Sequence, residues 1–125
     1  MMRTLATGMI ATLVVGGAAM AQAPTPVVYT WTGIGTNVPG SSKCPTYKMN
    51  IEVTVMGKAV KGIFQQENRD QRHFETTLDK GGKIKTAAMV GGGGMMDVVG
   101  DISDAGGHIK LDGYCIFQGP LAKKQ

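Results

Sequence analysis

Few residues in this 125-residue chain are of types and spacings that do chemistry. Serines and aspartates are present, but no nucleophile stands in a pattern that pairs it with a base and an orienting acid. His73 and His108 are the only histidines, and nothing in the sequence brings them together, whereas a metal site needs several converging ligands. We therefore predict no catalytic residue, no metal ligand, no cofactor and no enzymatic activity.

Two further motifs point toward binding chemistry, and both have simpler explanations. The methionines after residue 23 carry the soft thioethers that bind Cu(I); they are Met49, Met56, Met89, Met95 and Met96. They lack the closely repeated clusters of a copper-binding segment, so filling of the core is the better interpretation. The glycine run at residues 91–94 precedes a strand-like segment rather than a helix, which predicts a hairpin loop and not a phosphate loop.

The first 23 residues have the pattern of a secretory signal peptide. Arg3 supplies the positive charge, residues 5–18 form an uncharged apolar stretch, and small residues permit cleavage after Ala21 or Ala23. The stretch is short for a transmembrane helix, so we expect no membrane span after cleavage. The remainder, residues 24–125, has the size of one small domain, and we expect it to be periplasmic or secreted.

The two cysteines of the chain, Cys44 and Cys115, both follow the predicted leader. An even cysteine count in an exported chain favours a disulfide, because exported proteins meet an oxidising environment. The bridge would connect the early part of the domain to its last strand. In the chain-entropy model such a long loop contributes roughly 4 kcal/mol, a large share of the stability of a small domain.

The charge of the domain is mildly basic. Without Arg3 the 13 basic side chains become 12 against 9 acidic ones, a net charge of +3 with neutral histidines. The lysines are spread along the chain and are not interleaved with aromatic residues, which argues against a nucleic-acid partner. We expect a monomer with a solvated surface.

Segments with a period of two alternate with glycine-rich turns through residues 24–125. In residues 47–56 every second side chain is apolar, and similar segments are predicted over residues 27–35, 60–65, 72–78, 83–90, 95–102, 108–114 and 115–121. This pattern predicts an all-β fold, an antiparallel up-and-down β-barrel or a sandwich of seven or eight strands. We favour the barrel, because the connections are short hairpins and closure removes exposed edges.

Four motifs resemble those of a recurrent type of small exported bacterial β-barrel protein. They are an early aromatic strand (YTWTGIG), a loop ending in Cys-Pro (SSKCPTYKMNIEVTV), a glycine hairpin (MGKAVKGIF) and a late Gly-x-Cys strand (LDGYCIFQG). The resemblance covers nearly all of the domain and implies fold and export rather than an activity. The architecture is more loosely similar to exported barrels that inhibit lysozymes or proteases and to lipocalin-like carriers.

Two functions fit these features. The first hypothesis is a non-enzymatic binding or inhibitor-like protein of the cell envelope, whose loops contact an envelope or extracellular macromolecule. Its candidate contact residues are Asn37, Ser41, Ser42, Lys43, Asn68, Arg69, Gly92 and Gly93. The alternative is a carrier of a small apolar ligand inside the barrel. Tyr29 and Trp31 share one face of the first strand, where they form either an aromatic plug at one end of the barrel or a platform for a stacked ligand.

Overall fold

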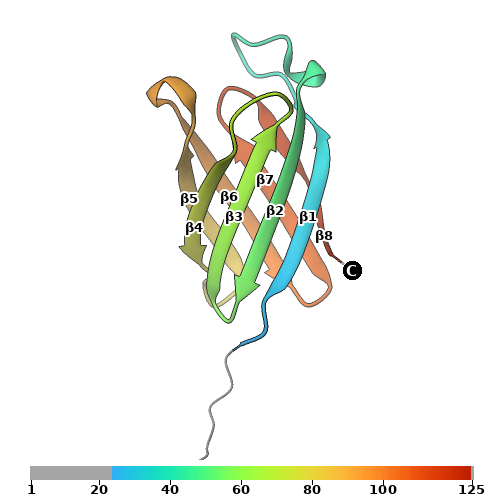
Figure 1. Cartoon of the computed structure of the whole chain (residues 1–125), viewed down its shortest axis with the longest axis vertical. Helices are drawn as coiled ribbons and strands as arrows, with labels where there is room; N and C mark the ends of the chain where they lie inside the picture. Colours follow the sequence, from blue (N-terminus) through green and yellow to red (C-terminus); the bar gives the residue numbers. More distant parts are fainter. Residues whose placement is uncertain (1–23, 125) are drawn as a thin grey trace, which may run out of the picture.

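The computed structural model describes residues 24–124, and the predicted signal peptide lies outside the described residues. Eight antiparallel strands form one curved sheet (Figure 1). They are β1 (Val27–Ile34), β2 (Lys48–Met56), β3 (Ala59–Gln66), β4 (Arg72–Thr77), β5 (Lys83–Met89), β6 (Met95–Ser103), β7 (Gly106–Asp112) and β8 (Ile116–Lys123). None of the helices in this part of the chain has the length and apolar character needed to cross a membrane. The all-β prediction is confirmed.

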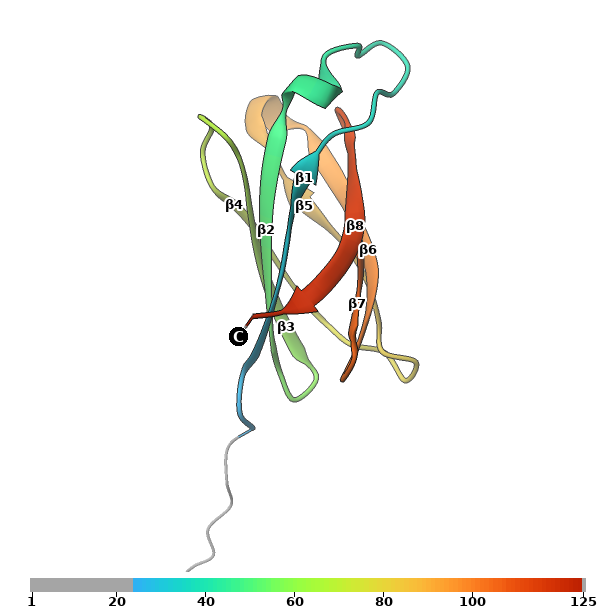
Figure 2. The same cartoon turned by 90° about the vertical axis from the view of Figure 1, so that its right-hand side faces the viewer.

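The sheet is a nearly closed up-and-down barrel. Each strand pairs with its neighbour in the chain, and the order β4-β3-β2-β1-β8-β7-β6-β5 also places the first strand beside the last. β1 meets β8 in a short ladder at Tyr29 and Thr30. Thr36, just beyond β1, forms an isolated bridge with Ile116, and β8 bends between these two places (Figure 2). β4 and β5 lie side by side but share no ladder. These pairings decide between the two predicted alternatives in favour of the barrel.

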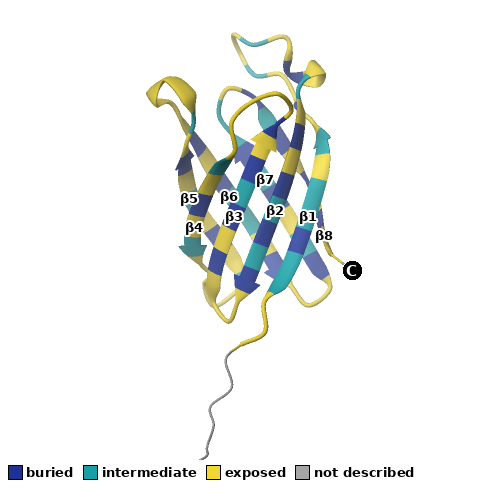
Figure 3. Ribbon diagram, in the orientation of Figure 1, coloured by how far each residue is buried: buried dark blue, intermediate teal, exposed yellow. Residues whose placement is uncertain are grey.

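Alternation of side chains explains why these segments are strands. In β2 every second residue is buried and points into the barrel: Met49, Ile51, Val53 and Val55. The same stripes of buried and exposed residues run along the neighbouring strands (Figure 3). The turn from β2 to β3 has Gly57 at φ 63°, the left-handed conformation that a tight Gly-X hairpin needs. The predicted hairpin and the inward face of β2 are confirmed.

The interior of the barrel is filled by its own side chains. The largest residues with almost no exposure are Phe64, Phe117, Met49, Met96, Ile109 and Leu111. Burial of each such side chain stabilises the fold by roughly 1.5–3 kcal/mol. Gly62 is needed beside them, because the ring of Phe74 occupies the space where a Cβ at this position would stand. The middle of the barrel is thus a core, and any binding site must lie at an end or on the outside.

The structure corrects some predicted boundaries. Residues 113–115, assigned from the sequence to two strands, form a turn between β7 and β8, closed by a backbone hydrogen bond from Gly113 to the Cys115 carbonyl (3.0 Å). Two short 3-10 turns, Cys44–Thr46 and Gly91–Gly93, were not predicted, because runs of three residues carry no periodic signal.

The connections divide between the two ends of the barrel. One end carries the β1–β2, β3–β4, β5–β6 and β7–β8 connections, at the top of Figure 1, and we call it the loop end. The opposite end carries the other hairpin turns together with the start of β1 and the end of β8. In an up-and-down barrel alternate connections share an end. The three segments predicted to contact a partner, which are distant in sequence, therefore lie together at the loop end.

Candidate functional site

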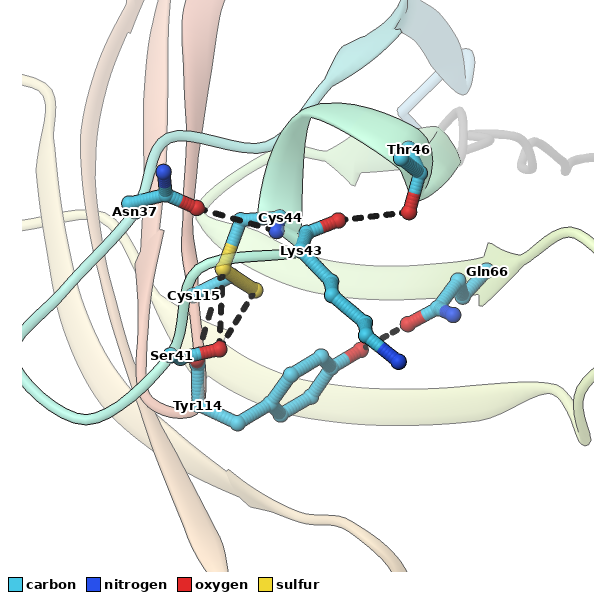
Figure 4. Close-up of a disulfide and its surroundings, with 8 residues drawn as sticks. All are labelled: Asn37, Ser41, Lys43, Cys44, Thr46, Gln66, Tyr114 and Cys115. Carbon is cyan, nitrogen blue, oxygen red and sulfur yellow. Dashed lines mark hydrogen bonds between the residues drawn. A yellow bond between two sulfur atoms is a disulfide. The ribbon is translucent and has the colours of Figure 1, made fainter.

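A disulfide between Cys44 and Cys115 anchors the loop end. The two Cα atoms are 5.7 Å apart, and the bridge ties the β1–β2 loop to the β7–β8 turn (Figure 4). Both cysteines have no exposed surface. The predicted pairing is confirmed, and it joins two of the four connections that form this end of the barrel.

Two of the predicted contact residues brace this disulfide. The Asn37 side chain accepts a hydrogen bond from the backbone N–H of Cys44 through Oδ1 (3.0 Å). The Ser41 hydroxyl lies 3.3 Å from Cys44 Sγ and must be the donor, since a disulfide sulfur carries no proton. Ser42 and Lys43, in the same loop, are exposed. Asn37 and Ser41 thus hold the loop in shape, and Ser42 and Lys43 face solvent.

An open pocket of about 530 Å³ lies at the loop end between the β3–β4 turn and the β5–β6 loop. Its floor consists of Met49 and Phe64, which are 0% and 2% exposed. Met49 pairs across the sheet with Gln66, and Phe64 pairs with Arg72. Partners in these pairs face the same side of the sheet, so all four side chains point inward. The inward layer therefore changes from apolar to polar as the barrel opens into the pocket.

The deepest polar group of the pocket is an amide. Gln66 is 8% exposed and is the one polar side chain among residues 24–124 that is classed with the buried core. The Tyr114 hydroxyl donates a hydrogen bond to Gln66 Oε1 (2.7 Å), as Figure 4 shows. The Tyr114 ring makes edge contacts with Tyr47 and Phe117, with centroids 6.4 and 5.9 Å apart. In the described chain Gln66 Nε2 donates no hydrogen bond to another protein group.

Two arginines stand over this floor. Arg69 is exposed in the β3–β4 turn, and Arg72 is half-buried at the start of β4. Arg72 reaches across the unpaired boundary between β4 and β5, because its Nη2 lies 3.2 Å from where a Cβ on Gly91 would be. Asp70 also lines the pocket, yet neither guanidinium forms an ion pair with it or with any other carboxylate of residues 24–124.

The arginines act on the same hydroxyl group. Burial raises the pKa of the Tyr114 phenol above its ordinary value; Arg69 opposes this rise, Tyr47 adds to it, and Arg72 again opposes it. Both guanidinium charges therefore act electrostatically on the Tyr114 oxygen.

The structure brings some of the predicted contact residues into this pocket and leaves others outside it. Asn68, Arg69 and Gly92 line it, while Gly93 is exposed in the same loop. Sequence reasoning missed the inward-facing Gln66 and Arg72. A signal for Gln66 exists, since it continues the apolar register of β3 at a position where a polar residue is unexpected.

Tyr29 and Trp31 lie elsewhere. Tyr29 is buried, and its hydroxyl donates to the Ser103 carbonyl (3.2 Å) at the end of β6, opposite the loop end. Trp31 is half-buried, and its indole lies against Gly33 and Gly119, where any Cβ would overlap the ring. Both aromatic side chains project from β1 toward strands across or beside it, and neither lines the loop-end pocket.

Exposed apolar side chains lie at the loop end as well, on different strands around the barrel. Of the five large apolar side chains that are exposed in the described chain, Met56 (45%) lies at the opposite end. The other four are Ile34 (59%), Met89 (67%), Met95 (53%) and Tyr114 (39%). Met89 and Met95 are cross-strand partners at the base of the glycine loop. We call these four residues the apolar rim.

Over residues 24–124 no group of three His, Cys, Asp or Glu side chains is placed to hold a metal ion. His73 and His108 are exposed on β4 and β7, which are not neighbours in the sheet.

No family model, curated protein or solved structure matches this chain. The motif resemblance to small exported barrels stays a prediction.

Proposed function

We propose that this chain is a non-enzymatic binding protein, exported to the periplasm or beyond, that holds a macromolecular partner of the cell envelope on its loop end. One observation carries the proposal: the pocket, the apolar rim and the disulfide-braced loop all lie at the same end of a filled barrel. Rigid strands hold these loops in place, which is how scaffolds position binding residues.

The composition of the loop end supports this proposal. Protein interfaces are enriched in Met, Tyr and Arg at their centres, and these residue types form the rim and the pocket. Exposed apolar side chains that adjoin one another, as Met89 and Met95 do across β5 and β6, mark interaction sites more often than scattered ones do. Among residues 24–124, Met56 is the single exposed large apolar side chain at the opposite end.

Two further features support export and the absence of catalysis. A buried disulfide persists in an oxidising compartment, which favours the periplasm or the exterior. The hydroxyls of Ser41 and Ser103 are bonded to the disulfide and to the Gly106 carbonyl, so both take part in holding turns.

The test is capture on protein that is tethered from the opposite end. A tag at the C-terminus, beyond β8, leaves the loop end free. Exported protein so immobilised is exposed to solubilised envelope material, and the retained partner is identified by mass spectrometry. The double variant Met89→Gln/Met95→Gln should lose at least tenfold of the captured partner, because two exposed apolar contacts are removed.

The matched control is Met56→Gln, which changes an exposed methionine (45%) at the other end of the barrel. It should capture the same partner at the same level as the wild type. Equal capture by all three proteins, or no retained partner, would contradict the proposal that the loop end binds a macromolecule.

A second function, a carrier of a small ligand, is favoured by the pocket itself. Its volume of about 530 Å³ lies within the usual range of ligand sites, and its floor is apolar. Because the barrel below is filled, the ligand would sit at the mouth rather than deep inside. Native mass spectrometry of protein purified gently from its envelope fraction tests this function. A mass excess that disappears on denaturation supports a carrier, and a bare mass contradicts it.

A further inference from the structure

We propose that the loop-end pocket binds an anionic group, a carboxylate or a phosphate, carried on a small apolar or aromatic body. The inference deepens the proposed function and rests on it, since it names what the loop end recognises. The anion would contact Arg69, Arg72 and the Gln66 amide, and the body would lie on Met49 and Phe64.

The first argument is the unpaired positive charge. Arg72 is half-buried at the mouth of the barrel, yet no carboxylate of residues 24–124 pairs with it. Charges withdrawn from water are normally paired, because desolvation is otherwise costly. A guanidinium presents a planar fork of donors that fits a carboxylate or a phosphate in two parallel hydrogen bonds. An anionic ligand would supply the partner that the chain itself does not.

The second argument is independent of charge. The Gln66 side chain is more than nine-tenths buried and lines the pocket, and its oxygen already accepts from Tyr114. Its Nε2 group donates no hydrogen bond to a protein acceptor within residues 24–124. A buried donor left without a partner costs about 1–3 kcal/mol. The amide therefore presents N–H groups to whatever enters, and an anion oxygen satisfies them.

The remaining lining defines the body of the ligand. Met49 and Phe64 form an apolar floor, and the edges of Tyr47 and Tyr114 stand beside it. A flat aromatic ring or a short branched alkyl group fits such walls. Asp70 lies at the same pocket and leaves two positive charges against one negative. The net positive balance selects an anion over a neutral or cationic ligand of the same shape.

The experiment is a titration followed by amide NMR on the exported protein, made from the full chain with its leader. The probes are phenyl phosphate and benzoate, with benzyl alcohol as the neutral compound of similar size. Both anions should shift the amide signals of Arg69, Gly91 and Gly92 in a saturable way. Benzyl alcohol should bind at least tenfold more weakly. Equal binding of all three compounds, or no saturable shift, would overturn the inference.

Charge variants test which residues hold the anion. Arg69→Gln alters an exposed turn residue, and Arg72→Gln alters the half-buried one; each should weaken phenyl phosphate binding roughly tenfold, the loss expected for one charge-assisted hydrogen bond. Lys58→Gln removes a positive charge from the turn at the opposite end and should change the affinity less than twofold. Losses as large in this control as in the arginine variants would show that only net charge matters.

A third variant keeps the inference testable if Arg72 also supports the fold. Gln66→Glu preserves size and the acceptor for Tyr114 but places a carboxylate beside the arginines, so phenyl phosphate binding should be abolished by competition. Unchanged binding in this variant would contradict the assigned site.

The same variants separate this inference from the proposed function. If the Arg69→Gln/Arg72→Gln protein still captures the envelope partner in full, the binding function stands and the anion site is wrong. If phenyl phosphate binds but no macromolecule is captured, the anion site stands and the macromolecular function is wrong. Two results together would place the anion on the macromolecule. The double arginine variant would lose capture of the partner, and phenyl phosphate would compete with the partner for the wild-type protein. If phenyl phosphate binds in a saturable way but does not compete with the partner, the anion belongs to a free ligand of the size of a metabolite.

Discussion

Removal of the disulfide should cost a large part of the stability of this domain. Cys44 and Cys115 are 71 residues apart in the chain. In the chain-entropy model a loop of this length restricts the unfolded chain by about 4 kcal/mol at 25 °C. Domains of this size are stable by only about 5–15 kcal/mol. The variant Cys44→Ala/Cys115→Ala should therefore fold, but with a much smaller margin.

Urea unfolding measures this effect directly. Trp31 is the only tryptophan and reports on the boundary between β1 and β8 through its fluorescence. With a slope of about 1.5–2 kcal/mol per molar urea, the loss corresponds to a midpoint lowered by about 2–3 M. Because both cysteines are fully buried, the missing sulfurs add a small packing loss to the entropic one.

A control separates the covalent link from its local contacts. Ser41→Ala removes the hydrogen bond to Cys44 Sγ while the disulfide stays, and it should cost about 1 kcal/mol or less. A double cysteine variant that stays within about 1 kcal/mol of the wild type would refute the reasoning, since the cross-link would then restrict little of the unfolded chain.

Three further outcomes are expected. Gly119→Ala should cost about 1–3 kcal/mol and change the emission of Trp31, because the new methyl group would overlap the indole; wild-type urea unfolding and emission would contradict this placement. Gly107→Ala should lower the free energy of unfolding more than Gly81→Ala does. A Cβ at residue 107 would overlap a backbone carbonyl of β6, whereas one at residue 81 makes ordinary contact, and equal urea midpoints of the two variants would contradict this expectation. Burial raises the pKa of Tyr114 above 10.0, so the folded state keeps its phenolic proton longer than the unfolded state. This contribution to stability is full below about pH 10 and is lost as the pH rises further, and Tyr114→Phe should therefore show a smaller fall in urea midpoint between about pH 8 and pH 11 than the wild type.

Most of the strands could be predicted, because apolar and polar residues alternate along a strand that has one buried and one exposed face. β2 was predicted over residues 47–56 and spans Lys48–Met56, since apolar and polar residues alternate without interruption. The turn at residues 113–115 could not be predicted, because Tyr114 and Cys115 are both typical strand residues. The turn is closed by the hydrogen bond from Gly113 to the Cys115 carbonyl, and Cys115 is linked to Cys44, 71 residues away in the chain.

The candidate site was only partly predictable for a related reason. Loop composition indicated Asn68, Arg69 and Gly92, which do line the pocket. Tyr114 reaches it from a turn that the sequence assigned to a strand, and Arg72 from the first position of β4. A pocket assembled from the ends of several strands depends on how those strands are ordered around the barrel, and no local pattern encodes that order.

The barrel consists of two meanders of four strands, β1–β4 and β5–β8, which share no ladder between β4 and β5 and only a short one between β1 and β8. Such halves, joined by a short connection, are suited to exchange between two chains, so that one half of each molecule completes the other. The disulfide has one cysteine in each half, Cys44 before β2 and Cys115 before β8. Once the disulfide has formed within one chain, it links the two halves of that chain to each other directly. The same bond that braces the loops therefore disfavours an exchange of the two halves between chains.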